Sequence, residues 1–191
     1  MSEGVITGAP TVVPTLTRVL SQLAVAAAED ELGEEEWEDA FDEALAQYHL
    51  AAYAHGAGVP IARLTPKERD LIQDVIDRQK EFVKGFKEAF LQGRYAGRPE
   101  VAARRAQMYA DATLGTWWMG HTRGWVLPAY PGDGTTQCKT KCRCRWRIDV
   151  LPGEGNADAH WLLGSADHCQ TCMQRSEDWG PVQIRNGELQ L

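Results

Sequence analysis

The first 137 residues of this 191-residue chain contain no cysteine, so neither a disulfide nor a thiolate metal site can form there. The chain also lacks an apolar run long enough to cross a bilayer, and residues 1–20 lack the basic start and apolar block of a secretory signal. We therefore expect a protein that is made and kept in a cytoplasm, where thiols stay mostly reduced, with no membrane as partner. No phosphate-binding glycine loop, nucleophile elbow or paired-carboxylate arrangement occurs, which argues against common enzyme classes and a small-molecule substrate.

What is present is typical of a soluble globular protein, with 43% apolar and 25% charged residues. The length suits one domain, or one domain with a small appendage. The net charge of −7 is unevenly distributed, because residues 29–43 contain ten carboxylates and no base whereas residues 139–147 contain five bases and no acid. The two regions are expected to face different surroundings, the acidic one most simply as a solvated helix face.

Apolar residues recur at three- and four-residue steps through the first two thirds of the chain, which predicts amphipathic helices with packed apolar stripes. The clearest helix start is Thr65-Pro66-Lys67-Glu68, where a hydroxyl cap precedes a proline and a carboxylate that can reach back to the cap. The expected fold class is mainly α: a flexible N-terminus at 1–10, then a helical bundle or helical hairpins over residues 11–124. The predicted helices cover about 11–28, 34–55, 66–92 and 100–122.

The pattern changes at Trp125, because the turn-rich stretch 127–134 cannot continue a helix. We expect a separate, small cysteine-rich α+β module over residues 125–191. Alternation with period two predicts a half-buried strand that begins at Lys141, as part of a β-hairpin at about 141–163. The residues expected on the inner side of this strand are Cys142, Cys144, Trp146, Ile148 and Val150.

A short helix is expected at about 168–178, capped by Ser165 or Asp167, so that Cys169 and Cys172 share its first turn. The positive end of the helix dipole favours the thiolate form of both cysteines. A cysteine cluster, a hairpin and then a helix that opens with Cys-x2-Cys is similar in order to treble-clef zinc modules.

All five cysteines lie within one 35-residue stretch. An odd number in a cytoplasmic protein argues against a pure disulfide framework. Thiolates paired at short spacing can instead occupy neighbouring corners around one tetrahedral zinc ion, which would hold the module together as a structural site. Such a site takes four ligands, so one cysteine is spare, or His168 substitutes for one of them. The favoured ligands are Cys144, Cys169 and Cys172, with either Cys142 or Cys138.

Other interpretations of these residues stay open. Cys169 and Cys172 also fit a redox or disulfide role, and all five cysteines also fit inert burial. A catalytic zinc needs an open coordination position and a positioned acid or base, and no His-Glu pair at helical spacing accompanies the cluster. His121, His160 and His168 are more simply packed or capping residues than catalytic partners of the thiols.

Basic residues occupy the other side of the predicted strand, at Lys141, Arg143, Arg145 and Arg147. With Trp146 and Trp161 nearby, they can track a nucleic-acid backbone or contact another acidic surface. The alternative is a solvated face on an edge strand, where bases discourage unwanted strand pairing.

The C-terminal region resembles a known family. The resemblance lies in the segments 127–138 (LPAYPGDGTTQC), 142–146 (CRCRW) and 168–172 (HCQTC), followed by Arg175 and the triplet Trp179-Gly180-Pro181. Together these segments, about 55 residues from end to end, resemble the C-terminal segment of tailed-phage minor head (head-morphogenesis) proteins.

The resemblance implies a component of the virion or procapsid, present in the host cytoplasm during assembly, with phage portal and capsid proteins as partners. It implies no catalytic chemistry. The leading hypothesis is therefore a non-enzymatic phage structural protein whose basic face contacts DNA or an acidic capsid surface. Two alternatives are a zinc-stabilised regulatory module that binds nucleic acid, and an enzyme, either a thiol oxidoreductase or a zinc hydrolase.

Overall fold

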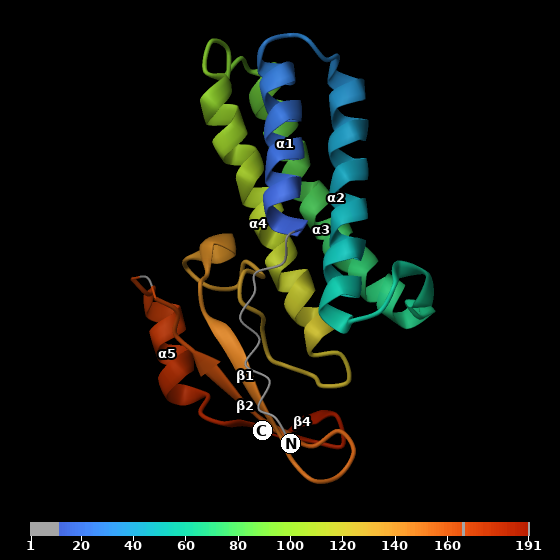
Figure 1. Cartoon of the computed structure of the whole chain (residues 1–191). Helices are drawn as coiled ribbons and strands as arrows, with labels where there is room; N and C mark the ends of the chain where they lie inside the picture. Colours follow the sequence, from blue (N-terminus) through green and yellow to red (C-terminus); the bar gives the residue numbers. More distant parts are fainter. Residues whose placement is uncertain (1–11, 166, 191) are drawn as a thin grey trace.

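The computed structural model describes residues 12–165 and 167–190, so the N-terminal residues 1–10, predicted to be flexible, lie outside the described part. Long helices form one end of the molecule, and a small sheet with one short helix forms the other (Figure 1). The helices are α1 (Val12–Ala28), α2 (Glu34–Ala57), α3 (Pro66–Leu91), α4 (Pro99–His121) and α5 (Gln170–Asp178), with 3-10 turns η1 (Ile61–Arg63) and η2 (Lys139–Lys141). The strands are β1 (Arg145–Val150), β2 (Ala157–Leu162), β3 (Val182–Arg185) and β4 (Glu188–Gln190).

Local capping interactions begin α3 where the sequence predicts a helix start. The Glu68 backbone N–H donates to the Thr65 hydroxyl at 3.3 Å, and the Glu68 carboxylate accepts from the Thr65 backbone N–H at 2.8 Å. Both halves of the capping box are therefore present, and two backbone donors that the helix itself leaves free are satisfied.

The helical part, α1 to α4, has its own core. α1 and α2 pack along α4, and α3 packs on α2. Phe86 of α3 lies at the centre of an aromatic cluster, with ring centroids 5.4 Å from Trp37, 5.9 Å from Phe41 and 5.8 Å from Tyr109. Near the lower end of this part, α2 and α4 approach so closely that a Cβ on Gly120 would lie 2.1 Å from the Tyr53 carbonyl oxygen. Only glycine fits at that crossing.

Residues 125–165 and 167–190 form the cysteine module, which contains an antiparallel sheet in the order β1-β2-β3-β4. Trp146 pairs with Trp161 across β1 and β2, and Ala157 of β2 pairs with Ile184 of β3. The described chain is thus mainly helical with one small antiparallel sheet. Strands β3 and β4 were not predicted, because strands of four and three residues are too short to show alternation clearly.

Three local expectations for the module are wrong. The first strand begins at Arg145 and not at residue 141, because residue 141 belongs to the turn η2 and residues 142–144 form neither helix nor strand. Val150 does not face inward but is 68% exposed, at the end of a strand on the edge of the sheet. The short helix begins at Gln170, and the residue in the capping position is Cys169, with extended backbone angles, in place of Ser165 or Asp167.

The two parts share apolar contacts. One buried cluster combines Ala52 of α2 and Trp117 and Trp118 of α4 with the cysteines and tryptophans of the module. The backbone N–H of Val126 also donates to the carbonyl of Gly187 at 3.2 Å, which ties the connecting loop to the last hairpin. Packing therefore continues across the place where the sequence changes character. Within the described residues, none of the helices combines the length and the apolar character that a membrane crossing requires.

Candidate metal centre

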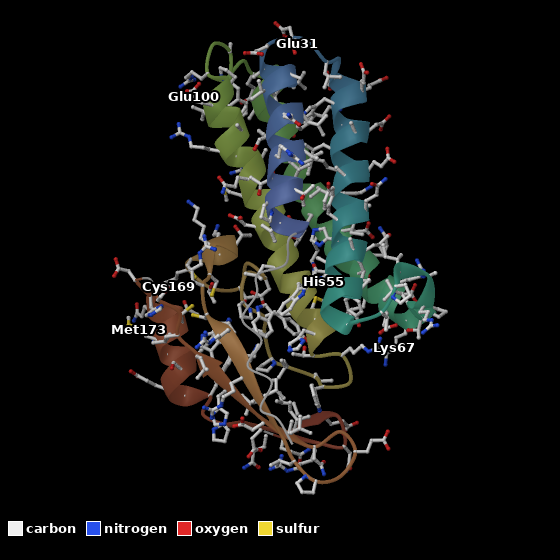
Figure 2. All side chains as sticks on the ribbon, in the orientation of Figure 1. Glu31, His55, Lys67, Glu100, Cys169 and Met173 are labelled. Carbon is white, nitrogen blue, oxygen red and sulfur yellow. The ribbon has the colours of Figure 1, made fainter. Side chains whose placement is uncertain are left out.

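All five cysteines gather where η2, the start of β1 and the start of α5 meet, and Figure 2 marks this place by Cys169. The Sγ of Cys172 lies 3.6 Å from the Sγ of Cys142 and 3.7 Å from that of Cys138. These three sulfur atoms all lie within 4.8 Å of one another, and all five cysteines are free thiols. Segments about thirty residues apart in the sequence therefore contribute to one group of sulfur atoms.

The distances in this group match a tetrahedral thiolate site. With Zn–S bonds of about 2.3 Å, two sulfur atoms at neighbouring corners of a tetrahedron lie about 3.8 Å apart. A disulfide needs a separation of only about 2 Å. The cluster of Cys138, Cys142 and Cys172 therefore has the spacing of three ligands around a metal ion, and it could hold one.

The two remaining cysteines flank this group. The Cys144 thiol interacts with those of Cys142 and Cys172, and the Cys169 thiol interacts with those of Cys138 and Cys172. The sequence treats Cys138 and Cys142 as alternatives, whereas the structure places both against Cys172. The open choice for a fourth ligand is therefore between Cys144 and Cys169.

Hydrogen bonds and burial divide the thiols into two kinds. The Cys142 thiol donates to Cys144, which raises the pKa of Cys142 and lowers the pKa of Cys144, and burial raises that of Cys142 further. Burial also raises the pKa of Cys138 and of Cys172. Burial acts in the same direction on Cys169, but backbone N–H groups of Cys172 and Cys138 donate to its sulfur and bring its pKa down to about 7. Cys138, Cys142 and Cys172, whose pKa values are raised, would lose their protons when a metal ion binds.

Backbone contacts around the cluster fix the cysteine-bearing segments. A Cβ on Gly164 would lie 2.2 Å from the carbonyl oxygen of Arg143, so glycine is required where the end of the hairpin lies against the residue that separates Cys142 from Cys144 in the sequence. The backbone of Gly164 also hydrogen-bonds to the Cys144 sulfur. Gly164 was not among the predicted site residues, and its only signal in the sequence is its position directly after a predicted strand.

The loop before Cys138 is held by one carboxylate. Asp133 accepts hydrogen bonds from the backbone N–H of Tyr130 at 2.7 Å and of Thr135 at 2.8 Å. The hydroxyl of Thr136, which follows directly, lies 3.1 Å from the Cys138 sulfur. This loop therefore brings the first cysteine to the cluster before the turn η2 begins.

Three tryptophans pack together beside the cysteines in the apolar cluster of the module: Trp146, Trp161 and Trp179. Trp146 of β1 stacks on Trp179 at 6.0 Å and meets Trp161 of β2 edge-on at 5.2 Å. The guanidinium of Arg175 lies 4.7 Å from the Trp179 ring centroid and 5.2 Å from that of Trp161. Its nitrogen Nη2 also donates to the Thr135 hydroxyl at 3.0 Å, so α5 is fastened to the loop before the cysteines.

The candidate histidines have separate surroundings. His121 stacks on Trp117 at the end of α4, and burial lowers its pKa. The Nε2 of His160, on β2, lies 3.1 Å from a carboxylate oxygen of Asp149, on β1. His168 directly precedes Cys169, but the compact group found among the described residues contains sulfur ligands only.

Fold and site together define a mainly helical protein with a cluster of cysteines that could hold a metal ion. Comparison of the chain with family models, with curated proteins and with solved structures gave no match. Its function is therefore inferred from its own residues.

Proposed function

We propose that the cysteine cluster holds one structural zinc ion. The observation that carries this proposal is the pair of sulfur separations at Cys172, 3.6 and 3.7 Å, which are close to the edge of about 3.8 Å in a zinc-thiolate tetrahedron. Cys142 and Cys172 are each only 1% exposed, which suits a closed site more than one open to a substrate. Four sulfur ligands and no open position are typical of structural zinc.

The order of the elements supports a treble-clef-like module. Two cysteines flank a turn before a β-hairpin, and a helix follows with one cysteine at its capping position and another in its first turn. Sulfur atoms at a helix start gain from nearby backbone N–H groups and from the helix dipole. This is the arrangement that two-part thiolate sites use to join a hairpin to a helix.

We further propose that the chain is a non-enzymatic structural or assembly protein of a tailed-phage head, acting with portal and capsid proteins in the procapsid or virion. The residues that carry the resemblance to minor head proteins contact one another: Trp146 stacks on Trp179, and Arg175 covers Trp179. Trp146 also donates from Nε1 to the carbonyl of Ala129 at 3.0 Å. These roles are architectural, which favours a structural function over a catalytic one.

Metal analysis of the purified full chain tests the zinc site. Preparation without chelator should leave about one zinc per chain, because structural sites bind tightly enough to survive purification. Less than about half an equivalent would contradict the proposal. Cys144→Ser and Cys169→Ser form a matched pair for the fourth ligand: one variant should lose zinc, and the other should keep it. Rapid modification of Cys138, Cys142 or Cys172 in the native, zinc-replete protein would favour the enzyme alternative, whereas rapid modification of Cys169 alone would identify it as the spare cysteine.

The assignment to the phage head is tested by the genes on either side of this one. Portal and terminase genes as neighbours would support it, and co-purification with the portal protein would support it further. A neighbourhood of host regulatory genes would instead favour the regulatory zinc module.

A further inference from the structure

The basic ridge consists of Lys139, Lys141, Arg143, Arg145 and Arg147, and every one of these side chains is exposed. Of the five bases of the ridge, only Arg147 forms an ion pair with a carboxylate among the described residues, with Asp149 at 3.1 Å. Asp111 of α4 lies near enough to Arg143 and Lys141 to interact with their charges, without forming an ion pair. Most of the ridge is therefore positive charge without direct compensation.

The cysteines and a tryptophan determine the direction of this ridge. Cys142, Cys144 and Trp146 are buried, so the alternate residues Arg143 and Arg145 must point outward. In an extended strand, side chains on one face repeat about every 7 Å. The same segment thus presents sulfur to the cluster on one side and a row of cations to solvent on the other.

Protection of an edge strand explains only part of this row. β1 is an edge strand, and Arg145 and Arg147 on it can discourage strand pairing between molecules. Lys139, Lys141 and Arg143 lie before β1 begins, where there is no sheet edge to protect. A continuous run of bases across a turn and a strand fits an extended polyanion better.

The partner that fits the ridge is the phosphate backbone of duplex DNA. Trp146 and Trp161 are only 4% and 2% exposed and pack on each other, so they cannot stack on bases as the sequence suggested. Contact through phosphates alone binds DNA without reading its sequence.

The acidic run of a second copy is a weaker partner for the ridge. Part of that run is already neutralised within the chain: Lys87 pairs with Glu34 at 3.0 Å and also with Glu38, and Lys80 pairs with Asp42 at 3.1 Å.

We infer that the basic ridge binds the phosphates of duplex DNA, independently of base sequence. We also infer that a metal ion in the cysteine cluster holds the backbone of the ridge in its binding conformation. The first half of this inference stands on the exposed cations alone. The second half rests on the proposed zinc site.

Fluorescence anisotropy with a labelled duplex of arbitrary sequence tests the ridge on the full chain. If four or five phosphates are neutralised, log K should fall with log salt with a slope of about −4. The triple variant Lys139→Gln/Lys141→Gln/Arg143→Gln should bind at least tenfold more weakly and reduce the slope by about 3. The matched control Lys67→Gln/Arg78→Gln/Lys84→Gln makes the same charge change on α3 and should bind as the native chain does.

Each outcome decides the inference. Equal losses in the two triple variants, or full affinity in the ridge variant, would overturn it. Self-association through the ridge without DNA binding, seen by light scattering, would overturn it in favour of a second copy. Zinc is measured in every sample, so a ridge variant that keeps its zinc but loses DNA supports the inference directly. Chelated protein that binds DNA with undiminished affinity would overturn the coupling to the metal. A chain isolated without zinc that still binds through the ridge would contradict the zinc site and the coupling, and it would support DNA binding by the ridge.

Discussion

The helical part and the cysteine module bury different kinds of side chain. The helices enclose long apolar and aromatic residues such as Leu16, Phe41 and Phe86, which are fully buried. The buried cluster of the module consists largely of cysteine, tryptophan and small residues, among them Ala157 and Ala159. Trp117 of α4 also belongs to this cluster. A segment of this size buries only a modest apolar surface, and small modules commonly gain stability from a metal or from disulfides. One chain thus combines a core of large apolar side chains with a core of tryptophans, small residues and thiols that could hold a metal ion.

Removal of the metal should produce the largest difference in stability between the helical part and the cysteine module. Structural zinc contributes on the order of 10 kcal/mol to the folding of small zinc modules, so a chelator should unfold the sheet and α5. The main helical core contains no residue of the module, and most of the far-UV helical signal should therefore remain. Hydrogen exchange should become fast in the module and in the last two turns of α4, around Trp117 and Trp118, and stay slow around Phe86.

Re-addition of zinc is the control for the chelator experiment and should restore protection in the module. Loss of the whole helical signal on chelation would show that both parts form one cooperative unit, and the comparison would then fail.

Truncation of a side chain in the aromatic core should have the opposite effect: it should destabilise the helical part and leave the cysteine module unchanged. Phe86→Ala removes a fully buried ring at the centre of the aromatic cluster, and it should lower the free energy of unfolding of the helical part by about 3 to 5 kcal/mol. The measurement is chemical denaturation followed by far-UV circular dichroism. Zinc content should not change, since the ligands lie in the other part.

Phe82→Ala is the matched control on the same helix. Phe82 is 62% exposed, and its loss should change the free energy of unfolding by no more than about 0.5 kcal/mol. If the two variants were equally destabilised, burial around Phe86 could not be what stabilises this part.

Acid should weaken the helical part through one buried histidine. His49 of α2 is fully buried with its Nδ1 2.7 Å from the Thr116 hydroxyl oxygen, and burial lowers its pKa from 6.5 to about 4. Between these two pH values the unfolded chain takes up a proton that the folded chain does not, so stability falls as pH falls through this window. The loss from this group approaches about 3 kcal/mol at pH 4.

Denaturation as a function of pH measures this effect, and His49→Gln is the comparison because it removes the titrating ring but keeps a polar side chain. The native chain should lose more stability than the variant between pH 6.5 and 4. Parallel curves for the two proteins would assign the acid sensitivity to other groups.

Local patterns allowed the helices to be predicted with good accuracy. The helix expected at about 66–92 runs from Pro66 to Leu91, because a capping box and a proline act within a few residues of one another. The hairpin loop was also foreseeable, since glycine and proline cluster between the two strands. The position of Cys169 before its helix was not, because several polar residues nearby were equally good candidates for the cap by sequence alone.

Residue order and spacing are enough to predict that helices come first and that every thiol lies in one short stretch, since helical periodicity and caps are local properties. The fold alone places Cys138 beside Cys172, 34 residues away, and packs Trp161 on Trp146 and not against a partner. The physical reason is that such contacts depend on how the hairpin, the short helix and the loop before them pack together. No pattern confined to one segment encodes that packing.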